Sequence, residues 1–510
     1  MKIKEIVEKI RKNKMDIIAN TNCGKIRGIK VEENILRFTG IPFATPPVGE
    51  LRFKAPVDPK PWTDIKDGTE FGPASIQPND EGEVVSMGLQ SEDCLLLNVW
   101  TQGLDDNKNR PVMVWIHGGG FFTGGTNDPW YDGTFFAKRG DVVLVSIQYR
   151  LGALGWLYLD ELGGEDFSSS KNNGLLDQVA ALKWVKNNIN NFGGDPDNIT
   201  IFGESVGSSS VCALMVTPSA KGLFNKVIAQ SGTFHHSRTH KKRGPYYRKV
   251  FMDACGVDDI NGLMNLSEEQ IRSATYEVTE EATFMADRMF MPVFDGDVLP
   301  EDPYDYIAEG NTSDILLMHG STRDEYHYWL KYYEEIMRNK PREAMMGLYK
   351  HVYRLTDAEI DELYQCHTDY DPDKSESDNY IDLATWGHFR STHARLSAAQ
   401  SQHSPTWEYL FEWSSPVDPE MGSYHAIEIP FVFYIEEDEI YGDNPPITLI
   451  EQVQNAWISF ARNGDPNHSD LPVWSQYNEK EKPKMVFNVN QRVENDPDGV
   501  LRKKWEEVMG

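Results

Sequence analysis

The sequence predicts an α/β fold, in which a central, mainly parallel β-sheet carries helices on both faces. Between about residues 95 and 230, short aliphatic runs alternate with helical patterns, an order that is typical of parallel sheets. The runs themselves are almost continuously apolar, as expected for strands that helices cover on both sides. Both observations point to the same layered architecture.

Eight runs along the chain are predicted to be strands, the last of them as an edge strand. They cover residues 95–100, 112–116, 142–147, 199–202, 226–229, 315–318, 407–413 and 485–489. Residues 174–192 have apolar side chains at helical spacing and end at two glycines, so a helix is expected there. The stretches around 260–300 and 326–400 are mostly helical in pattern and are expected to be insertions around the sheet. We therefore expect one domain over residues 21–510, although this length suffices for about three.

Residues 1–20 are expected to form a separate helical extension. Its first 14 residues carry six Lys or Arg side chains against two Glu. Aliphatic side chains recur at helical spacing, namely Ile3, Ile6, Val7 and Ile10. A membrane-surface helix has a similar charge pattern, but four aliphatic side chains without an aromatic one make a weak anchor. We therefore favour a short helix docked on the main body.

The charge and the cysteines exclude several classes of protein. The net charge is −29, so nucleic acid is not an expected ligand, because phosphate binding requires clustered Lys and Arg. No apolar run is long enough for a membrane span, and the N-terminus lacks the apolar stretch of a secretory signal. The five cysteines lie far apart and include no CxxC pair, which argues against a disulfide framework and a zinc site. The simplest setting is a reducing, cytoplasmic one.

A serine between two glycines follows the fourth predicted strand. The segment Gly203-Glu204-Ser205-Val206-Gly207 precedes an apolar helical pattern, and this strand–turn–helix context is where a G-x-S-x-G motif carries a nucleophile. A strand that turns sharply into a helix exposes Ser205 Oγ at the carboxyl end of the sheet, where ligands of such sheets bind. The flanking glycines leave room for the turn. Ser205 is therefore the predicted nucleophile.

A glycine-rich loop follows the second predicted strand. Residues 117–121 read HGGGF, and three glycines allow successive backbone N–H groups to point at one spot. Together with the N–H of Val206, such a loop holds the oxyanion that forms when a nucleophile attacks a carbonyl, at about 3 kcal/mol per donor. His117 is expected to shape this loop rather than to act as the base.

A serine nucleophile needs a histidine base and an acid that orients it. In chains with this motif the acid and then the histidine follow the serine, on loops after later strands. His425 meets this requirement, because it lies in a loop after the strand predicted at 407–413. Other histidines follow Ser205 too closely or lie in a helical pattern where packing or surface roles are expected: His235, His236, His240, His388 and His393. Asp324 and Glu325 both follow the strand predicted at 315–318, where a helix cap is the alternative role, and spacing alone does not choose between them.

Segments along nearly the whole chain after about residue 20 match one family in order. They include FTGIPFATPPVGELRF (38–53), SEDCLLLNVW (91–100), HGGGF (117–121), QYRLGALGWL (148–157), FGGDPDNITIFGESVG (192–207), AQSG (229–232), PVFDGDVLP (292–300) and FARNGDP (460–466). The chain resembles the type-B carboxylesterases, the α/β-hydrolase family that includes bacterial p-nitrobenzyl esterases, animal carboxylesterases and cholinesterases. The resemblance implies an α/β-hydrolase fold and the hydrolysis of carboxylic esters.

The resemblance also implies roles for individual residues. Glu325 ends a G-x-x-x-D-E segment and matches the family's acid in place of Asp324, while His425 matches the G-x-x-H segment of the base. It further implies that Gly119 and Gly120 are the two oxyanion donors of the loop. Glu204 and Ser231 are implied to belong to a supporting network, in which Ser231 acts through hydrogen bonds.

The chain departs from the family pattern at several positions. Tyr326 follows the acid where glycine is usual, and Val206 stands where alanine is commoner. Cys94 lacks its usual partner, because the matching upstream position is Ser75, so a free thiol is expected. Cholinesterases bind choline with a tryptophan at a position where this chain has Val84, so choline esters are not expected substrates.

We expect a serine carboxylesterase that hydrolyses small to medium apolar esters through an acyl-enzyme, without metal or cofactor, as a monomer or small homo-oligomer. Five aromatic residues are candidates for an apolar substrate pocket, although each such residue is more often part of a core: Phe121, Phe122, Phe234, Tyr326 and Trp329. Thioesterase, amidase and lipase activities stay open, because nothing in the sequence separates them from esterase activity. The complete set of Ser205, Glu325 and His425 opposes a non-catalytic relative.

Overall fold

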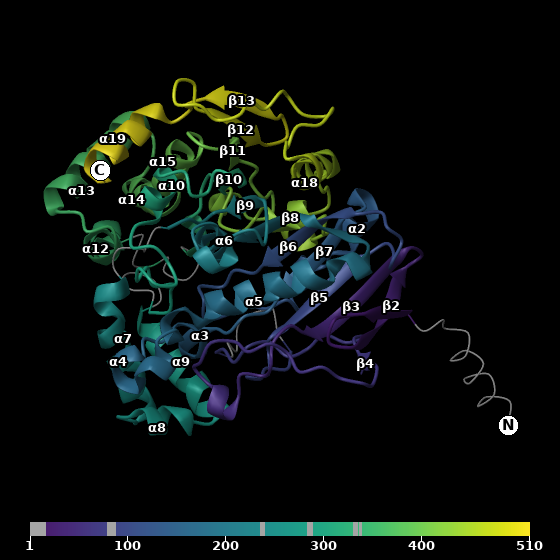
Figure 1. The fold of residues 1–510 in the computed structure, drawn as a ribbon. Coiled ribbons are helices and arrows are strands. Elements are labelled where there is room, and N and C mark those ends of the chain that lie inside the picture. The colour runs from purple at the N-terminus through teal and green to yellow at the C-terminus, as the bar shows by residue number, and fades with distance from the viewer. Residues whose placement is uncertain are drawn as a thin grey trace.

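The computed structural model describes residues 17–78, 88–234, 240–282, 289–329, 335 and 339–509. Within these ranges the chain is built around a 13-stranded sheet (Figure 1). Its strands are β1 (Ile17–Asn20), β2 (Lys25–Glu32), β3 (Ile35–Pro42), β4 (Lys66–Asp67), β5 (Leu96–Thr101), β6 (Arg110–Ile116), β7 (Val143–Ile147), β8 (Gly194–Glu204), β9 (Lys226–Gln230), β10 (Leu316–Thr322), β11 (Thr406–Phe411), β12 (Pro483–Phe487) and β13 (Arg492–Asn495).

The α-helices cover the sheet and extend beyond it. They are α2 (Thr134–Gly140), α3 (Gly152–Trp156), α4 (Asp160–Gly163), α5 (Asn173–Asn188), α6 (Val206–Met215), α7 (His240–Cys255), α8 (Ile260–Met264), α9 (Glu268–Ala282), α10 (Pro303–Ala308), α12 (Pro341–Gly347), α13 (Asp357–Tyr370), α14 (Glu376–Thr385), α15 (Ser391–Gln400), α16 (Ile429–Phe433), α17 (Asp438–Tyr441), α18 (Ile447–Asn463) and α19 (Gly499–Met509). The predicted helix 174–192 is confirmed by α5 and the 3₁₀ turn Ile189–Phe192, after which Gly193 has a φ of 75°.

The sheet is parallel in its centre and antiparallel towards its ends. The strands follow the order β1-β2-β3-β5-β7-β6-β8-β9-β10-β11-β12-β13, with β4 beside β2. Every neighbouring pair from β7 to β12 is parallel, whereas the pairs from β1 to β7 along this order, and β12 with β13, are antiparallel. The prediction of a mainly parallel sheet is thereby confirmed. The carboxyl ends of β6, β8, β10 and β11 meet at one edge, where parallel sheets bind ligands.

The strand predictions hold for the centre of the sheet and fail at its ends. Each of the eight predicted runs overlaps one of the strands from β5 to β12. The prediction that 485–489 forms an edge strand was wrong, because β13 pairs with β12 on its outer side. Strands β1 to β4 were not predicted, since they are partly exposed and lack a continuous apolar run. The helical extension expected over residues 1–20 is wrong for residues 17–20, which form β1, and residues 1–16 lie outside the described ranges.

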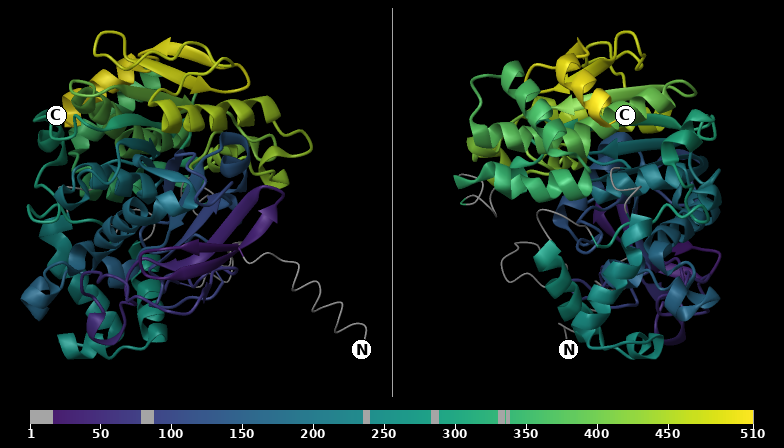
Figure 2. Two further views of the ribbon diagram at one scale, coloured as in Figure 1. Left: turned by 45° about the vertical axis from the view of Figure 1, so that its right-hand side comes forward. Right: turned by 90° about the vertical axis from the view of Figure 1, so that its left-hand side faces the viewer.

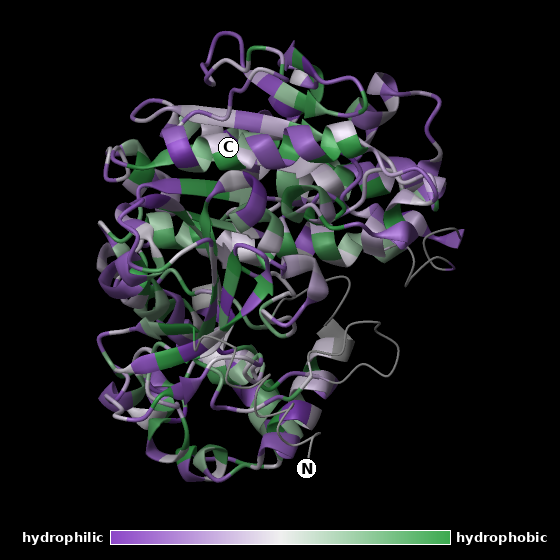
Figure 3. Cartoon of the chain, turned by 90° about the vertical axis from the view of Figure 1, so that its right-hand side faces the viewer, coloured by the Kyte–Doolittle hydropathy of each residue, from purple (hydrophilic) through white to green (hydrophobic). Residues whose placement is uncertain are grey.

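Alternating side chains of the central strands enter two separate apolar cores. On β6, Val112, Val114 and Ile116 belong to one cluster, while Met113 and Trp115 belong to the other. Helices α5 and α6 pack against the first face, and α2, α16 and α18 lie on the second. Hydrophobic segments accordingly concentrate in the interior of the molecule, between more polar outer helices (Figure 3). Burial on both faces explains why these strands read as unbroken apolar runs.

The helical stretches outside the sheet form two groups. Helices α7, α8 and α9 gather at the lower left of the molecule in Figure 1, and α12, α13 and α14 lie with α19 above them on the same side (Figures 1 and 2). The second group has its own apolar cluster, which includes Met345, Leu363, Tyr380 and Trp505. None of the helices in the described ranges combines the length and the apolar character that crossing a bilayer requires.

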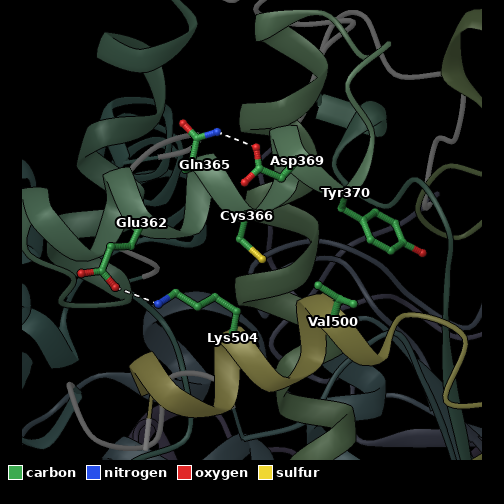
Figure 4. Close-up of a pocket in the computed structure, with 7 residues that line it drawn as sticks. All are labelled: Glu362, Gln365, Cys366, Asp369, Tyr370, Val500 and Lys504. Carbon is green, nitrogen blue, oxygen red and sulfur yellow. Dashed lines mark hydrogen bonds and ion pairs between the residues drawn. The ribbon is translucent and has the colours of Figure 1, made fainter.

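A surface cavity of about 640 Å³ lies between α13 and α19, lined in part by Cys366 and Lys504 (Figure 4). Lys504 pairs with Glu362 across this cavity at 2.7 Å. Its lining includes none of the predicted site residues.

Candidate active site

Ser205 sits in the tight turn between β8 and α6. Its backbone has φ 57° and ψ −124°, a conformation that a non-glycine residue adopts only when its surroundings impose it. The glycines on either side are required, because a β-carbon at Gly207 would lie 2.1 Å from Ile116 O and one at Gly203 would lie 2.6 Å from Gly207 C. The Ser205 N–H donates to Gln230 O at 2.9 Å, which ties the turn to the end of β9. The predicted strand–turn–helix context of the serine is confirmed.

Glu325 and His425 form a buried pair at the same edge of the sheet. Glu325 follows β10 and His425 follows β11, and these two strands are parallel neighbours. Glu325 Oε2 lies 2.5 Å from His425 Nδ1, and its Oε1 accepts a hydrogen bond from the Thr322 N–H at 2.8 Å. The Glu325 carboxylate is therefore held on both oxygens, and it fixes the proton of the imidazole on Nδ1.

Asp324, the other carboxylate left open by spacing, has a different partner. Asp324 Oδ2 accepts a hydrogen bond from the Ser423 N–H at 2.8 Å, and the Asp324 N–H donates to Ser423 O at 2.9 Å. Arg323 also pairs with this carboxylate at 2.9 Å. Asp324 thus anchors the loop that carries His425, while its neighbour contacts the imidazole itself.

The second imidazole nitrogen of His425 faces the residue next to the nucleophile. His425 Nε2 lies 3.1 Å from Glu204 Oε1, and both side chains are buried. No hydrogen bond joins Ser205 Oγ to the imidazole in this arrangement of the described residues. The structure therefore brings His425 to the turn that carries Ser205, with a carboxylate on each ring nitrogen.

The glycine loop after β6 packs directly against this turn. A β-carbon at Gly118 would lie 3.2 Å from Ser205 Cβ and 3.0 Å from Glu204 O, so a larger residue there would press on this turn. Gly119 and Gly120 have φ values of 101° and 65°, and Gly119 O accepts the Thr123 N–H at 2.9 Å to close the loop. Among the described residues, none accepts a hydrogen bond from the N–H of Gly119, Gly120 or Val206. These three N–H groups are therefore free hydrogen-bond donors beside Ser205 in the part of the chain that the structure describes, as an oxyanion hole requires.

His117 is a structural part of the same loop. Its Nδ1 lies 2.9 Å from Gly118 O, its ring stacks on Tyr149 at 4.5 Å, and the Tyr149 hydroxyl donates to His117 O at 2.8 Å. Burial lowers the pKa of His117 to about 4, so its ring is neutral at neutral pH. This arrangement matches the expectation that His117 shapes the loop.

The five aromatic candidates for a substrate pocket divide into two groups. Trp329 and Phe122 are half-buried beside the site: the Trp329 ring lies 4.9 Å from that of His425, and the Phe122 ring lies where a β-carbon on Gly120 would be. Phe121 does not line a pocket, because it is fully buried and packs on Trp156 at 4.6 Å.

The other two candidates are also largely core residues. Phe234 packs edge-to-face on Phe294 and Tyr304, and the buried Tyr326 hydroxyl lies 3.3 Å from His388 Nδ1. The sequence reasoning missed Phe389, whose ring lies 5.2 Å from that of His425.

Glu428 is a second residue that the sequence reasoning missed. It follows His425 by three positions and is fully buried, with its Oε1 3.4 Å from Gln230 Nε2. Burial, reinforced by the charges of Glu204 and Glu325, raises its pKa to about 8. The signal was present in the sequence, since Glu428 interrupts the apolar run that follows His425.

Ser231 lies at the end of β9 with a φ of 56°, and its N–H donates to Gly320 O at 2.8 Å. Its buried Oγ makes no hydrogen bond with any described residue. The contact that Ser231 makes here is therefore a backbone one, between the ends of β9 and β10.

Comparisons with known proteins agree along nearly the whole chain. Residues 15–502 match the model of the carboxylesterase family. Para-nitrobenzyl esterase from Bacillus subtilis (strain 168) is 36% identical over 500 residues, which cover 96% of this chain and 98% of that protein. Phenmedipham hydrolase from Pseudarthrobacter oxydans is 34% identical over 476 residues, covering 90% and 92% of the two chains.

Solved structures show the same relationship in three dimensions. The crystal structure of the Geobacillus stearothermophilus carboxylesterase EST55 at pH 6.2 has a TM-score of 0.86 and 35% identity, covering 96% of this chain and 100% of that one. The family resemblance and the α/β-hydrolase fold predicted from the sequence are both confirmed. The chain is therefore a carboxylic ester hydrolase that belongs to the carboxylesterase family.

Proposed function

We propose that Ser205 is the nucleophile of this hydrolase, that His425 is its general base and that Glu325 orients the base. The observation that carries this proposal is the buried contact of 2.5 Å between His425 Nδ1 and Glu325 Oε2, beside the turn that exposes Ser205. With Nδ1 protonated and held by Glu325, only Nε2 is available to take a proton from Ser205. Ser205 then attacks the ester carbonyl to form a tetrahedral intermediate.

The charges that develop in this step have partners in the site. The imidazolium of His425 has Glu325 at one nitrogen and Glu204, at 3.1 Å, at the other. The N–H groups of Gly119, Gly120 and Val206 hold the oxyanion. His425 protonates the leaving alcohol, and water then attacks the acyl-Ser205 ester by the same sequence to release the acid.

The nucleophile is tested by labelling with a fluorophosphonate probe. We expect wild type and Ser210→Ala to be labelled, and Ser205→Ala to remain unlabelled. Ser210 is the matched control, because it is a buried serine on α6, the helix that follows Ser205, and it accepts a hydrogen bond from Gln178 Nε2. Equal labelling of Ser205→Ala and wild type would overturn the assignment.

We propose small to medium apolar esters as substrates. The half-buried Phe122 and Trp329 offer apolar contact surface at the site, and the buried Phe389 stacks against Trp329 with the ring centroids 6.4 Å apart. The test is a panel of p-nitrophenyl esters of increasing acyl length, with one amide and one thioester of matched acyl group. We expect the highest kcat/KM at short to medium acyl length. Activity confined to long acyl chains, or a preference for the amide or thioester, would contradict this substrate class.

We propose that the protein works in the reducing cytoplasm. All five cysteines are free thiols, and Cys94 is fully buried, where desolvation raises its pKa to about 12. A buried thiol of this kind is inert and needs no oxidising compartment. Cell fractionation of the source organism checks this location, and recovery of the native enzyme outside the cytoplasmic fraction would contradict it.

A further inference from the structure

Behind the nucleophile turn, five buried side chains form a continuous polar chain. The first two links are between nitrogen atoms: His393 Nε2 lies 3.2 Å from the Gly232 N–H nitrogen, and His393 Nδ1 lies 2.8 Å from His319 Nδ1. His319 Nε2 then lies 2.8 Å from Ser397 Oγ. Ser397 Oγ lies 2.9 Å from Glu408 Oε2, and the other Glu408 oxygen pairs with Lys484 Nζ at 2.8 Å.

The direction of every hydrogen bond in this chain follows from its two ends. The Gly232 N–H can only donate, so His393 Nε2 must be the accepting nitrogen and His393 Nδ1 must carry the proton. His319 Nδ1 therefore accepts, and His319 Nε2 donates to Ser397. The Ser397 hydroxyl in turn donates to Glu408, whose charge Lys484 balances. One tautomer of each ring satisfies the whole chain.

Both rings are held neutral, as this arrangement requires. The two imidazoles lie edge to edge, with an interplanar angle of 6° and their centroids 5.0 Å apart, and they share a single proton between their Nδ1 atoms. The charged groups that face them are Glu408 on β11 and Lys484 on β12. Burial lowers the pKa of His319 to about 3 and holds that of His393 well below 6.5. A second proton on His319 Nδ1 would set two N–H groups against each other, and one on His393 Nε2 would remove the acceptor of the Gly232 N–H.

Gly232 connects this chain to the nucleophile. A β-carbon at Gly232 would lie 2.2 Å from Ser205 O, so the two backbones are in direct contact. Gly232 O accepts a hydrogen bond from Ser208 Oγ at 2.6 Å, and Ser208 lies in the first turn of α6. Gly232 is thus held by two hydrogen bonds: its carbonyl accepts one from Ser208 on α6, and its N–H donates one to His393 on α15.

We propose that His393 is a positioning residue of this esterase: it holds Gly232 against the Ser205 turn, and His319, Ser397, Glu408 and Lys484 set its tautomer. This inference rests on the proposed role of Ser205 as nucleophile. His393 was expected from the sequence to be a packing or surface residue, and its burial and hydrogen bonds revise that expectation. Loss of the acceptor leaves a buried N–H without a partner, which shifts the turn that supports the strained backbone of Ser205.

The test compares two variants of His393 with the same pair at His367. His393→Leu removes the acceptor, whereas the amide oxygen of His393→Gln replaces it at a similar reach. His367 is a matched control, because it is also a buried histidine whose Nε2 accepts a hydrogen bond from an N–H group, that of Trp505 Nε1 at 3.1 Å. It differs in its place, since it lies on α13 and pairs with Asp382. Each variant is assayed for kcat, for KM and for the rate of fluorophosphonate labelling, after thermal unfolding shows that it is folded.

We expect His393→Leu to lower kcat and the labelling rate about tenfold with KM unchanged, since a small displacement of a reacting group acts on the chemical step. His393→Gln is expected to restore most of both, and His367→Leu to lower the melting temperature without changing kcat. Equal kcat in His393→Leu and wild type, or equal losses in His393→Leu and His367→Leu, would overturn the proposal. Unlabelled wild type would instead overturn the role of Ser205, so the two failures are distinguishable.

A spectroscopic measurement covers the case in which His393→Leu does not fold. Wild-type enzyme with ¹⁵N-labelled histidine is recorded by NMR, and the signals lost in His393→Gln identify His393. We expect a neutral ring with a protonated Nδ1 and an unprotonated Nε2 from pH 5 to pH 8. A protonated Nε2, or titration in this range, would contradict the hydrogen-bonded chain.

Discussion

His425 Nδ1 and Glu325 Oε2 lie 2.5 Å apart inside the protein, although 100 residues separate the two along the chain. The parallel pairing of β10 with β11 brings them together, since each residue follows the carboxyl end of one of these strands. The contact fixes which imidazole nitrogen carries the proton, and thus which one faces the nucleophile turn.

Glu325→Gln is expected to lower kcat by about 10³–10⁴-fold, because an amide keeps the shape of the side chain but no longer selects the productive tautomer or stabilises the imidazolium. Asp324→Asn is the neighbouring control. Asp324 contacts the backbone of Ser423 and not the imidazole, so a loss of about tenfold or less is expected. Steady-state kinetics of both variants check this, and a larger loss in Asp324→Asn would reverse the assignment.

Glu204→Gln is expected to lower kcat by about tenfold or more. The Glu204 carboxylate lies 3.1 Å from His425 Nε2, so it stabilises the positive charge that the imidazole carries in the transition state. The substitution removes one of the two carboxylate partners of the imidazolium, and a hydrogen bond to a charged group contributes about 1.5–3 kcal/mol. Steady-state kinetics of Glu204→Gln and wild type measure this loss. Equal kcat in the two proteins would show that this contact does not contribute to the reaction.

Glu428→Gln is expected to stabilise the protein increasingly as pH rises. The folded-state pKa of Glu428 is raised from 4.5 to about 8, so between these values the folded protein binds a proton that the unfolded chain has released. Below pH 4.5 both states are protonated and the group has no effect on stability. Across the window the free energy of unfolding of wild type falls with pH, by at most about 5 kcal/mol.

The measurement for Glu428 is the difference in melting temperature between Glu428→Gln and wild type at pH 5 and at pH 8. We expect the melting temperature of Glu428→Gln, relative to that of wild type, to be higher at pH 8 than at pH 5. Glu420→Gln provides a reference for an exposed carboxylate, where no such change is expected. A constant difference for Glu428→Gln across the range would show that this carboxyl does not titrate there.

Gly119→Ala is expected to lower kcat by about 10²–10³-fold, the effect of losing one oxyanion donor. Its φ is 101°, and a β-carbon would lie 2.3 Å from Thr123 O, so the loop must move. Gly222→Ala is the matched control: its φ is also positive, at 77°, but its β-carbon meets no atom within 4 Å. That variant should lose about 1 kcal/mol of stability and keep wild-type kcat. Equal kcat in Gly119→Ala and wild type would exclude this loop from the reaction.

Local patterns predicted the centre of the molecule well. The strands β5 to β12 are buried on both faces, so their apolar runs are unbroken and visible in the sequence. The half-exposed strands β1 to β4 carry no such run and were missed. Residues 17–20, which form β1, had been included in the helical extension because of the helical spacing earlier in that segment. Phe121 was one of the pocket candidates, whereas in the structure its ring is fully buried and packs on Trp156.

The sequence by itself determined the α/β fold and the turn that carries Ser205, because a strand, a G-x-S-x-G segment and a helix are adjacent along the chain. It could not choose between Asp324 and Glu325 by spacing, nor identify Glu428 or the chain behind Gly232. Those depend on side chains far apart in sequence: Glu408 and Lys484 are 76 positions apart, yet they meet at 2.8 Å across neighbouring strands. Only the packing of the strands decides which groups lose water together, and that desolvation makes His393 a neutral acceptor and Glu428 a protonated acid.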